Sequence, residues 1–108
     1  MAASGLSARV KFVGAQPATA VAEHLQRHRI LVVPSLWHEP FGMVALEGAA
    51  CGCVIVGSRG GGLPEAIGPT GVTFNLGDSG DLADKLAALL SRPATWQTFL
   101  DAAPAHLE

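Results

Sequence analysis

The sequence predicts an α/β fold with a mainly parallel sheet, and three observations lead to this class. Short apolar runs of strand length recur, the clearest being Ile30–Val33 and Val54–Val56. Segments with helical spacing separate these runs, and glycines follow them where the chain must turn. Runs without alternation are typical of strands buried on both faces, and alternating strands and helices favour parallel pairing with right-handed crossovers. Ligands of such sheets bind outside the carboxyl ends of the strands.

The first βαβ unit is expected within residues 10–33. Residues 10–13 are a candidate strand, and a helix is expected over residues 17–27, with Pro17 in its first turn. Three residues mark the inner face of this helix: Val21, Leu25 and His28. The strand over residues 30–33 completes the unit.

The second half of the chain continues the alternation. We expect a helix over 42–51, a strand over 54–56, a short helical turn over 63–67 and a strand over 72–74. A further helix follows, capped by Asp78 or Ser79, and four of its residues share one face: Leu82, Leu86, Leu89 and Leu90. The final element is a short helix over 93–100, with Trp96 and Phe99 packed on the core. Gly48 costs its helix up to about 1 kcal/mol, so we expect close packing there. The glycine-rich loop over 57–62 lacks the G-x-G-x-x-G spacing of dinucleotide sites.

Length and charge exclude several classes of function. The 108 residues make one small domain, and the net charge of −2 is spread without a basic run, so neither nucleic acid nor an anionic membrane is an expected partner. No apolar stretch is long enough to span a bilayer. The first residues lack the charged and apolar regions of a signal peptide, which favours a cytoplasmic location.

Two residue pairs have the spacing of metal ligands but lack further ligands nearby. Cys51 and Cys53 have no second cysteine pair, so reduced thiols in the core are favoured over a disulfide or a zinc site. His24 and His28 are spaced i, i+4 on the expected helix, without a third ligand beside them. We therefore expect no metal, and a solvated helix face is the simpler interpretation.

Two carboxylates, Glu39 and Glu47, flank the start of the helix expected over 42–51. Pro40 holds Glu39 in extended geometry, and Gly42 lets the backbone approach a ligand closely. The first-turn N–H groups have no intrahelical partners and form an anion site; here they belong to Gly42, Met43 and Val44. Glu47 lies about 7.5 Å beyond Gly42 along the helix axis. A ligand with hydroxyls at both ends and a diphosphate between them fits this layout.

Residues 39–47, E-P-F-G-M-V-A-L-E, resemble the E-x7-E signature of retaining glycosyltransferases with the GT-B fold, in particular the family 4-like enzymes (glycosyl transferases group 1). Residues 50–65 continue the resemblance, because A-C-G-C-V-I-V-G-S is similar to A-C-G-x-P-V-V-A-S and G-G-L-P-E to G-G-x-P-E. The resemblance covers most of residues 10–91. It implies a three-layer Rossmann-like parallel sheet, the second half of a GT-B C-terminal domain, with residues 1–108 as one truncated donor-binding domain.

The resemblance also implies roles for the site residues. Glu39 takes the catalytic position at the transferred sugar, and Glu47 hydrogen-bonds the ribose. The implied substrate-binding residues are Phe41, Gly42, Met43, Val44, Glu47, Gly61, Gly62 and Glu65. The implied donor is a UDP-, GDP- or ADP-sugar, with no cofactor. Without the resemblance, the two glutamates would be interpreted as ordinary solvated carboxylates. Gly61 and Gly62 would then be a flexible turn, and Phe41 a packing residue.

The resembled enzymes contain parts that this sequence does not. They have a separate N-terminal acceptor domain, and their C-terminal domain begins with βα units that carry the cations for the diphosphate. We therefore expect a fragment of a retaining glycosyltransferase that is inactive alone; the alternative is a non-catalytic protein-interaction module that inherited the scaffold. The βα units that this sequence lacks include the strands that would lie beside residues 30–33 in the resembled sheet. Without them, residues 30–33 would be an open edge of the sheet. Either residues 10–13 pair with that edge or a second copy covers it, and we expect a homodimer.

Overall fold

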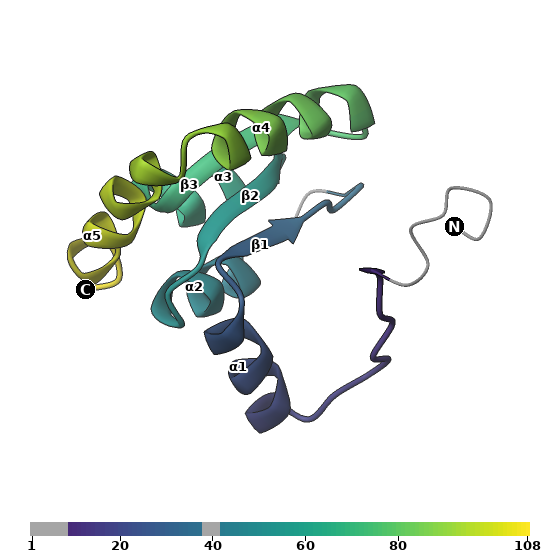
Figure 1. Ribbon diagram of the computed structural model, residues 1–108, viewed down its shortest axis with the longest axis vertical. Coiled ribbons are helices and arrows are strands. Elements are labelled where there is room, and N and C mark those ends of the chain that lie inside the picture. The colour runs from purple at the N-terminus through teal and green to yellow at the C-terminus, as the bar shows by residue number, and fades with distance from the viewer. Residues whose placement is uncertain (1–8, 38–41) are drawn as a thin grey trace.

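The computed structural model describes residues 9–37 and 42–108, and its centre is a three-stranded parallel sheet (Figure 1). The strands are β1 (Ile30–Val33), β2 (Val54–Arg59) and β3 (Gly71–Asn75), in the order β1-β2-β3. Ile30 aligns with Val54 across the first pair, and Ile55 with Gly71 across the second. The predicted α/β class, the parallel sheet and three of the four predicted strands are therefore confirmed.

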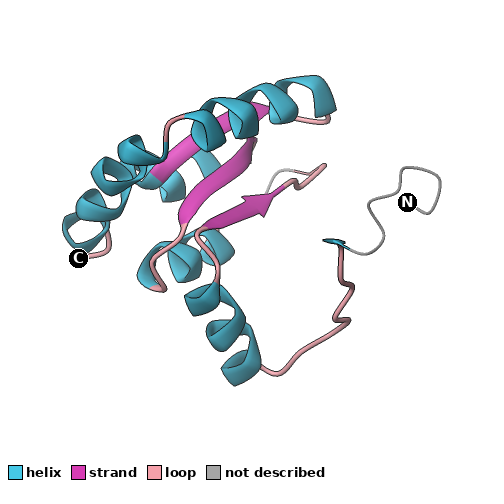
Figure 2. Ribbon diagram, viewed as in Figure 1, coloured by secondary structure: helices cyan, strands magenta, loops and turns pink. Residues whose placement is uncertain are grey.

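Helices cover both faces of the sheet (Figure 2). They are α1 (Ala18–Arg27), α2 (Met43–Ala50), α3 (Leu63–Ile67), α4 (Ser79–Ser91) and α5 (Trp96–His106), with short 3-10 turns η3 (Gly68–Thr70) and η4 (Pro93–Thr95). One core lies between the sheet and α2 and α3, around Ile55, and the other lies between the sheet and α4, around Val56 and Leu89. All residues of β2 except Arg59 are buried, as its apolar sequence requires. The result is a three-layer Rossmann-like arrangement.

Helix α5 reaches both cores. Trp96, Phe99 and Leu100 pack against the core on the α4 side, whereas Ala103 is buried in the core on the α2 and α3 side. The indole N–H of Trp96 donates to the carbonyl oxygen of Leu89 at 2.8 Å. Figure 1 shows α5 beside the end of the sheet from which the strands start. The packing predicted for Trp96 and Phe99 is confirmed, but the helix extends to His106 and not to Leu100.

The strand predicted over residues 10–13 is wrong. These residues have no strand structure, and the side chain of Phe12 is 84% exposed. A strand needs a neighbouring edge, and within the described residues β1 pairs with β2 alone. Direct pairing of residues 10–13 with β1 is therefore not part of this structure, and β1 forms one edge of the sheet.

Two smaller predictions about helix faces also fail. His28 lies beyond the end of α1 and is exposed, with its ring Nδ1 2.6 Å from the carbonyl oxygen of His24. Leu90 is 61% exposed because the inner face of α4 runs through Leu82, Leu86 and Leu89.

None of the helices in the described part of the chain is both long enough and apolar enough to cross a membrane.

The cap of α4 is Asp78, one of the two predicted residues. Its side chain accepts a hydrogen bond from the backbone N–H of Asp81 at 2.9 Å.

The close packing predicted at Gly48 is also confirmed. A Cβ on Gly48 would lie 2.4 Å from Cδ2 of Leu31 and 2.8 Å from Cδ1 of Ile55, so α2 touches the sheet at this point.

Candidate functional site

The start of α2 and the helix α3 are in direct contact beyond the carboxyl ends of β1 and β2. Gly42 is the N-cap of α2 and has φ +64°, a left-handed conformation that favours glycine. A Cβ at Gly42 would lie 2.6 Å from Cβ of Ala66 and 3.2 Å from Cα of Leu63. Glycine is therefore required here both by its backbone angle and by its neighbours. The contact brings together the two sequence blocks that resemble the glycosyltransferase motifs.

The first turn of α2 contains backbone N–H groups that have no partner within the helix. The N–H groups of Ala45 and Leu46 donate to the carbonyl oxygen of Gly42, at 3.1 and 3.4 Å. Met43 and Val44 precede these bonds, so no carbonyl of the helix itself serves their N–H groups. Both side chains are exposed. This geometry is able to hold an anion or a hydroxyl-bearing ligand in front of the helix.

The glycine-rich loop leads into α3 through Gly61 and Gly62. Gly61 has φ +57°, and Gly62 is the N-cap of α3, with its carbonyl accepting the N–H of Ala66 at 3.0 Å. Glu65 lies in the first turn of α3 and is exposed. The predicted short helical turn is confirmed, and its N-terminal end lies beside Gly42.

Glu47 lies on the side of α2 that faces α1, where the two helices enclose an open cavity of about 250 Å³. The residues that line it are Ala18, Ala22 and Leu25 of α1, with Glu47, Ala50 and Cys51. Glu47 is the charged group among these lining residues, and the others are apolar or a thiol. Sequence reasoning placed Glu47 but missed the α1 residues, because their contact with α2 depends on how two separate helices pack.

The two cysteines lie in different environments at the end of α2. Cys53 is buried, and its thiol lies within hydrogen-bond distance of the carbonyl oxygens of Leu25 and His28, at 3.2 and 3.4 Å. Burial raises the pKa of the Cys53 thiol, and the charge of the neighbouring Cys51 adds to the increase. Cys51 is half-buried and lines the cavity beside Glu47. Because the thiolate is the nucleophile, Cys51 is the better chemical probe of this cavity.

A charged cluster lies at the carboxyl ends of β2 and β3. Arg59 donates to the side-chain oxygen of Asn75 at 2.7 Å and lies 3.6 Å from the carboxylate of Asp81. Asp81 also accepts the backbone N–H of Asn75 at 2.7 Å and pairs with Lys85 at 3.1 Å. The pKa of Asp81 is lowered, chiefly by the bond from Asn75 and next by that from Lys85. The cluster thus ties the carboxyl ends of β2 and β3 to α4, and Asp81 pairs with both cations.

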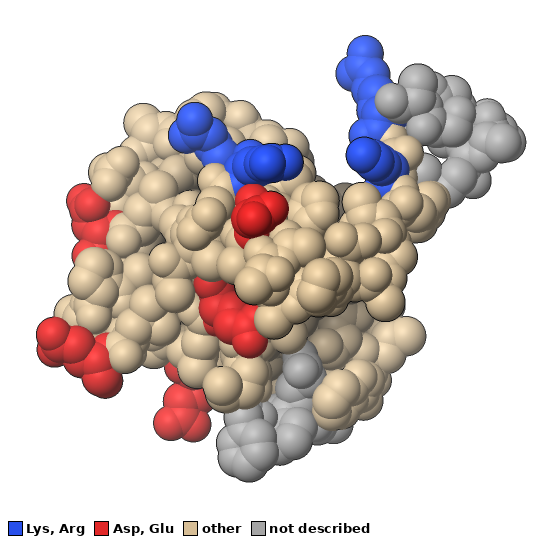
Figure 3. Space-filling model, turned by 90° about the horizontal axis from the view of Figure 1, so that it is seen from below, with Lys and Arg blue, Asp and Glu red and all other residues tan. Residues whose placement is uncertain are grey.

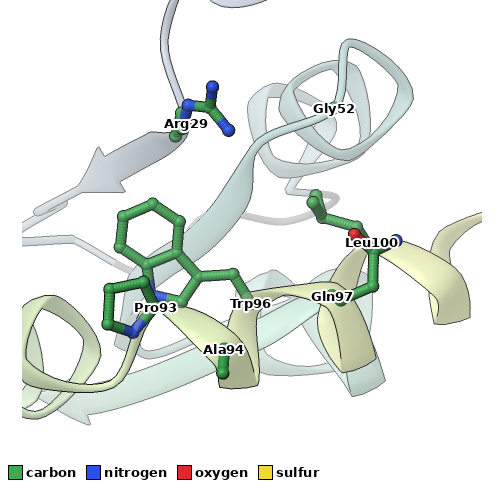
Figure 4. A pocket seen from close by; sticks show the side chains of 7 residues that line it. All are labelled: Arg29, Gly52, Pro93, Ala94, Trp96, Gln97 and Leu100. Carbon is green, nitrogen blue, oxygen red and sulfur yellow. The ribbon is translucent and has the colours of Figure 1, made fainter.

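Another cavity, of about 480 Å³, lies at the opposite end of the sheet (Figure 4). Arg29 precedes β1 and Gly52 precedes β2, and both line this cavity with Trp96 and Leu100 of α5. The cavity is larger than the one at Glu47 and lies where β1 and β2 start, whereas the first turn of α2 lies beyond the carboxyl ends of the strands, where α/β sheets bind ligands. We therefore place the candidate site at Gly42 and the first turn of α2, with Glu47 further along the same helix.

Charge on the surface is sparse and mixed. Figure 3 shows a few Lys and Arg side chains and a few Asp and Glu side chains on a mostly uncharged face, with one acidic group directly beside basic ones. Within the described ranges 9–37 and 42–108, no three His, Cys, Asp or Glu side chains group as metal ligands.

Two of the predicted site residues lie outside the described residues. They are Glu39, the predicted catalytic residue, and Phe41, a predicted substrate-binding residue.

Comparison with known proteins agrees with this arrangement. Residues 1–92 match the family described as glycosyl transferases group 1. The chain is 42% identical over 92 residues to the D-inositol 3-phosphate glycosyltransferase of Mycobacterium avium (strain 104), a match that covers 83% of this chain and 22% of that relative. It is 35% identical over 106 residues to the protein of the same name from Rhodococcus opacus (strain B4), with 96% and 24% covered.

A solved structure shows the same likeness. The chain is similar to sucrose-phosphate synthase from Thermosynechococcus elongatus with a TM-score of 0.87 and 32% identity. This match covers 98% of the chain and 27% of the synthase. The chain therefore spans about a quarter of the length of the proteins that it resembles.

Proposed function

We propose that this chain, which belongs to the glycosyl transferases group 1 family, carries part of the nucleotide-sugar site of a retaining glycosyltransferase. In this proposal residues 1–108 are one truncated donor-binding domain. The observation that carries it is the contact of Gly42 with Ala66, since it places the start of α2 and the glycine-rich loop on one surface. The first-turn N–H groups of Met43 and Val44, beside a glycine-rich loop, suit a diphosphate and a sugar.

The nucleoside half of the ligand is assigned to the cavity between α1 and α2. Glu47 stands among small apolar side chains there, and a carboxylate in such a setting suits the two ribose hydroxyls while the apolar walls suit a base. The N–H groups of Met43 and Val44 face the diphosphate. Gly61, Gly62 and Glu65 border the transferred sugar, which Glu39 of the E-x7-E motif would contact.

We further propose that the 108-residue chain transfers no sugar by itself. Departure of a nucleoside diphosphate requires stabilisation of developing negative charge, and the transition state is oxocarbenium-like. Arg59, at the end of β2, and Lys85, on α4, are both paired with Asp81. An assay with UDP-glucose, GDP-mannose and ADP-glucose as donors is expected to give no product. The acceptor in this assay is D-inositol 3-phosphate, which the name of the relatives indicates.

A second candidate function is a protein-interaction module, and one observation favours association. Strand β1 is an edge of the sheet, and Ile30, Leu31 and Val32 are only half-buried. An open edge with apolar side chains favours pairing with another strand. We propose that the isolated chain forms a symmetric homodimer through this edge. A monomer mass in sedimentation equilibrium at millimolar concentration would contradict the dimer.

Calorimetric titration tests the proposed site and separates the two functions. The ligands are UDP-glucose, GDP-mannose and ADP-glucose, and at least one is expected to bind the wild type. Glu47→Ala is expected to weaken that binding by roughly ten- to a hundredfold, since a hydrogen bond to a charged group contributes about 1.5–3 kcal/mol. Glu23→Ala is the matched control because Glu23 is an exposed glutamate of α1 outside the lining residues. Absence of binding with all three ligands favours the interaction module.

A further inference from the structure

His106, in the last turn of α5, contacts the end of α3 across a sequence separation of 40 residues. Its ring Nε2 lies 2.6 Å from the carbonyl oxygen of Ala66. The ring also fills the space beside Gly68, where a Cβ would lie 2.6 Å from Cε1 of His106. His106 lies beyond residues 1–92, the part that matches the family.

The chemistry of this contact fixes which atom is the hydrogen-bond donor. A carbonyl oxygen only accepts, so Nε2 of His106 carries the hydrogen and donates to Ala66. Helix α3 ends at Ile67, and the carbonyls of a last helical turn have no intrahelical partner. His106 therefore caps the C-terminal end of α3 from a different helix.

Ala66 is held from a second direction as well. Its Cβ lies against Gly42, where any side chain would come within 2.6 Å, and Ala66 itself is only 9% exposed. The carbonyl of Ala66 is thus fixed by His106 while its methyl group rests on the start of α2. A shift of α3 along or away from the sheet must break one of these two contacts.

We propose that His106 is a positioning residue for the nucleotide-sugar site. By holding Ala66 it fixes α3, and with it Gly62 and Glu65, relative to the first-turn N–H groups of α2. His106 does not touch the ligand and acts through Ala66. This inference rests on the proposed function of the site, but the position of α3 is also measurable without any ligand.

The test compares two substitutions that differ in the hydrogen bond. His106→Gln keeps an N–H donor, whereas His106→Phe keeps a ring beside Gly68 and loses the donor. For whichever of UDP-glucose, GDP-mannose or ADP-glucose binds the wild type, His106→Phe is expected to bind roughly three- to tenfold more weakly, the effect of one hydrogen bond. His106→Gln is expected to stay within about twofold of the wild type, given the same hydrogen bond.

The control is Ser91→Ala, because the Ser91 hydroxyl also donates to a backbone carbonyl at a helix end, that of Ala88 at 3.0 Å, but belongs to α4. It is expected to leave ligand binding unchanged. Equal affinities of the wild type and His106→Phe would overturn the proposal, as would a His106→Gln variant that binds as weakly as His106→Phe. If the His106→Phe variant does not fold, the His106→Gln variant decides alone. Ligand affinity lower than that of the wild type in His106→Gln contradicts the role of the hydrogen bond, and affinity equal to that of the wild type supports it.

A ligand-free measurement separates this inference from the proposed function. If the wild type binds none of the three sugars, the proposed function fails, and amide hydrogen exchange then decides the role of His106. His106→Phe is expected to speed exchange at Ala66 and Gly68 roughly three- to tenfold and to shift the amide resonance of Gly42. Unchanged exchange and an unchanged Gly42 resonance would overturn the positioning role.

Discussion

Gly42 and Ala66 approach so closely that a Cβ built on Gly42 would lie 2.6 Å from the Cβ of Ala66. Gly42 lies in the block of residues 39–47 and Ala66 directly follows the block of residues 50–65, and their contact joins the start of α2 to α3 outside the carboxyl ends of β1 and β2. The proposed site lies between the first turn of α2 and the glycine-rich loop and depends on their spacing, so this contact makes the proposed site sensitive to changes that do not touch a ligand.

Substitution of Gly42 by alanine is expected to destabilise the protein for two reasons. The left-handed backbone costs an L-residue about 1–2 kcal/mol, and the contact with Ala66 adds about 1–3 kcal/mol of overpacking. Gly52→Ala is the control, because Gly52 has φ +88° but a Cβ added there would meet no atom within 4 Å. Urea unfolding is expected to show a larger loss for Gly42→Ala. Equal losses for the two variants would show that the contact with Ala66 contributes nothing.

Gly48→Ala is expected to destabilise the protein although alanine is the better helix former. The change gains up to about 1 kcal/mol of helix propensity. It also forces a Cβ against Leu31 and Ile55, and overpacking of this kind costs about 1–3 kcal/mol. The same change combined with Leu31→Val, which removes the closest atom, is expected to cost less than the sum of the two single variants in thermal unfolding. Additive costs would contradict this account.

Asp81→Asn is expected to lower the melting temperature at pH 7 but not in acid. The pKa of Asp81 is lower in the folded protein than in the unfolded chain, so its carboxylate stabilises the fold above the unfolded pKa of about 3.9. That contribution is lost as the pH falls through the lower, folded pKa. The difference between variant and wild type is therefore expected to shrink below about pH 4. Asp84→Asn, an exposed acid of the same helix, is the control, and an equal effect there would contradict the role of Asp81.

The central strands could be predicted from sequence because burial on both faces leaves a plain signal. Residues 30–33 and 54–56 are uninterrupted apolar runs, and both pair as predicted. Residues 10–13 also have the length of a strand, yet they do not pair with β1, although β1 is an edge of the sheet in the described residues. Strand formation depends on packing against a neighbour, which a four-residue pattern does not record.

The candidate site was predictable only in part, for a similar reason. The motif residues Gly42 and Glu47 are recognisable in the sequence, and each lies on the predicted helix or at its start. The α1 wall of the cavity at Glu47 and the contact of His106 with Ala66 arise from packing between distant segments. No local pattern records such contacts.

The alkylation rate of Cys51, with and without nucleotide, tests the location of the proposed site most directly. Cys51 lines the cavity with Glu47, while Cys53 is buried with a raised pKa and is expected to react slowly. A Cys51→Ser variant gives the background rate of Cys53. We predict that at least one of UDP, GDP and ADP, at millimolar concentration, slows the reaction of iodoacetamide at Cys51 in proportion to its occupancy. A nucleotide that binds by calorimetry but leaves the Cys51 rate unchanged, or failure of all three to slow it, would contradict a nucleotide site between α1 and α2.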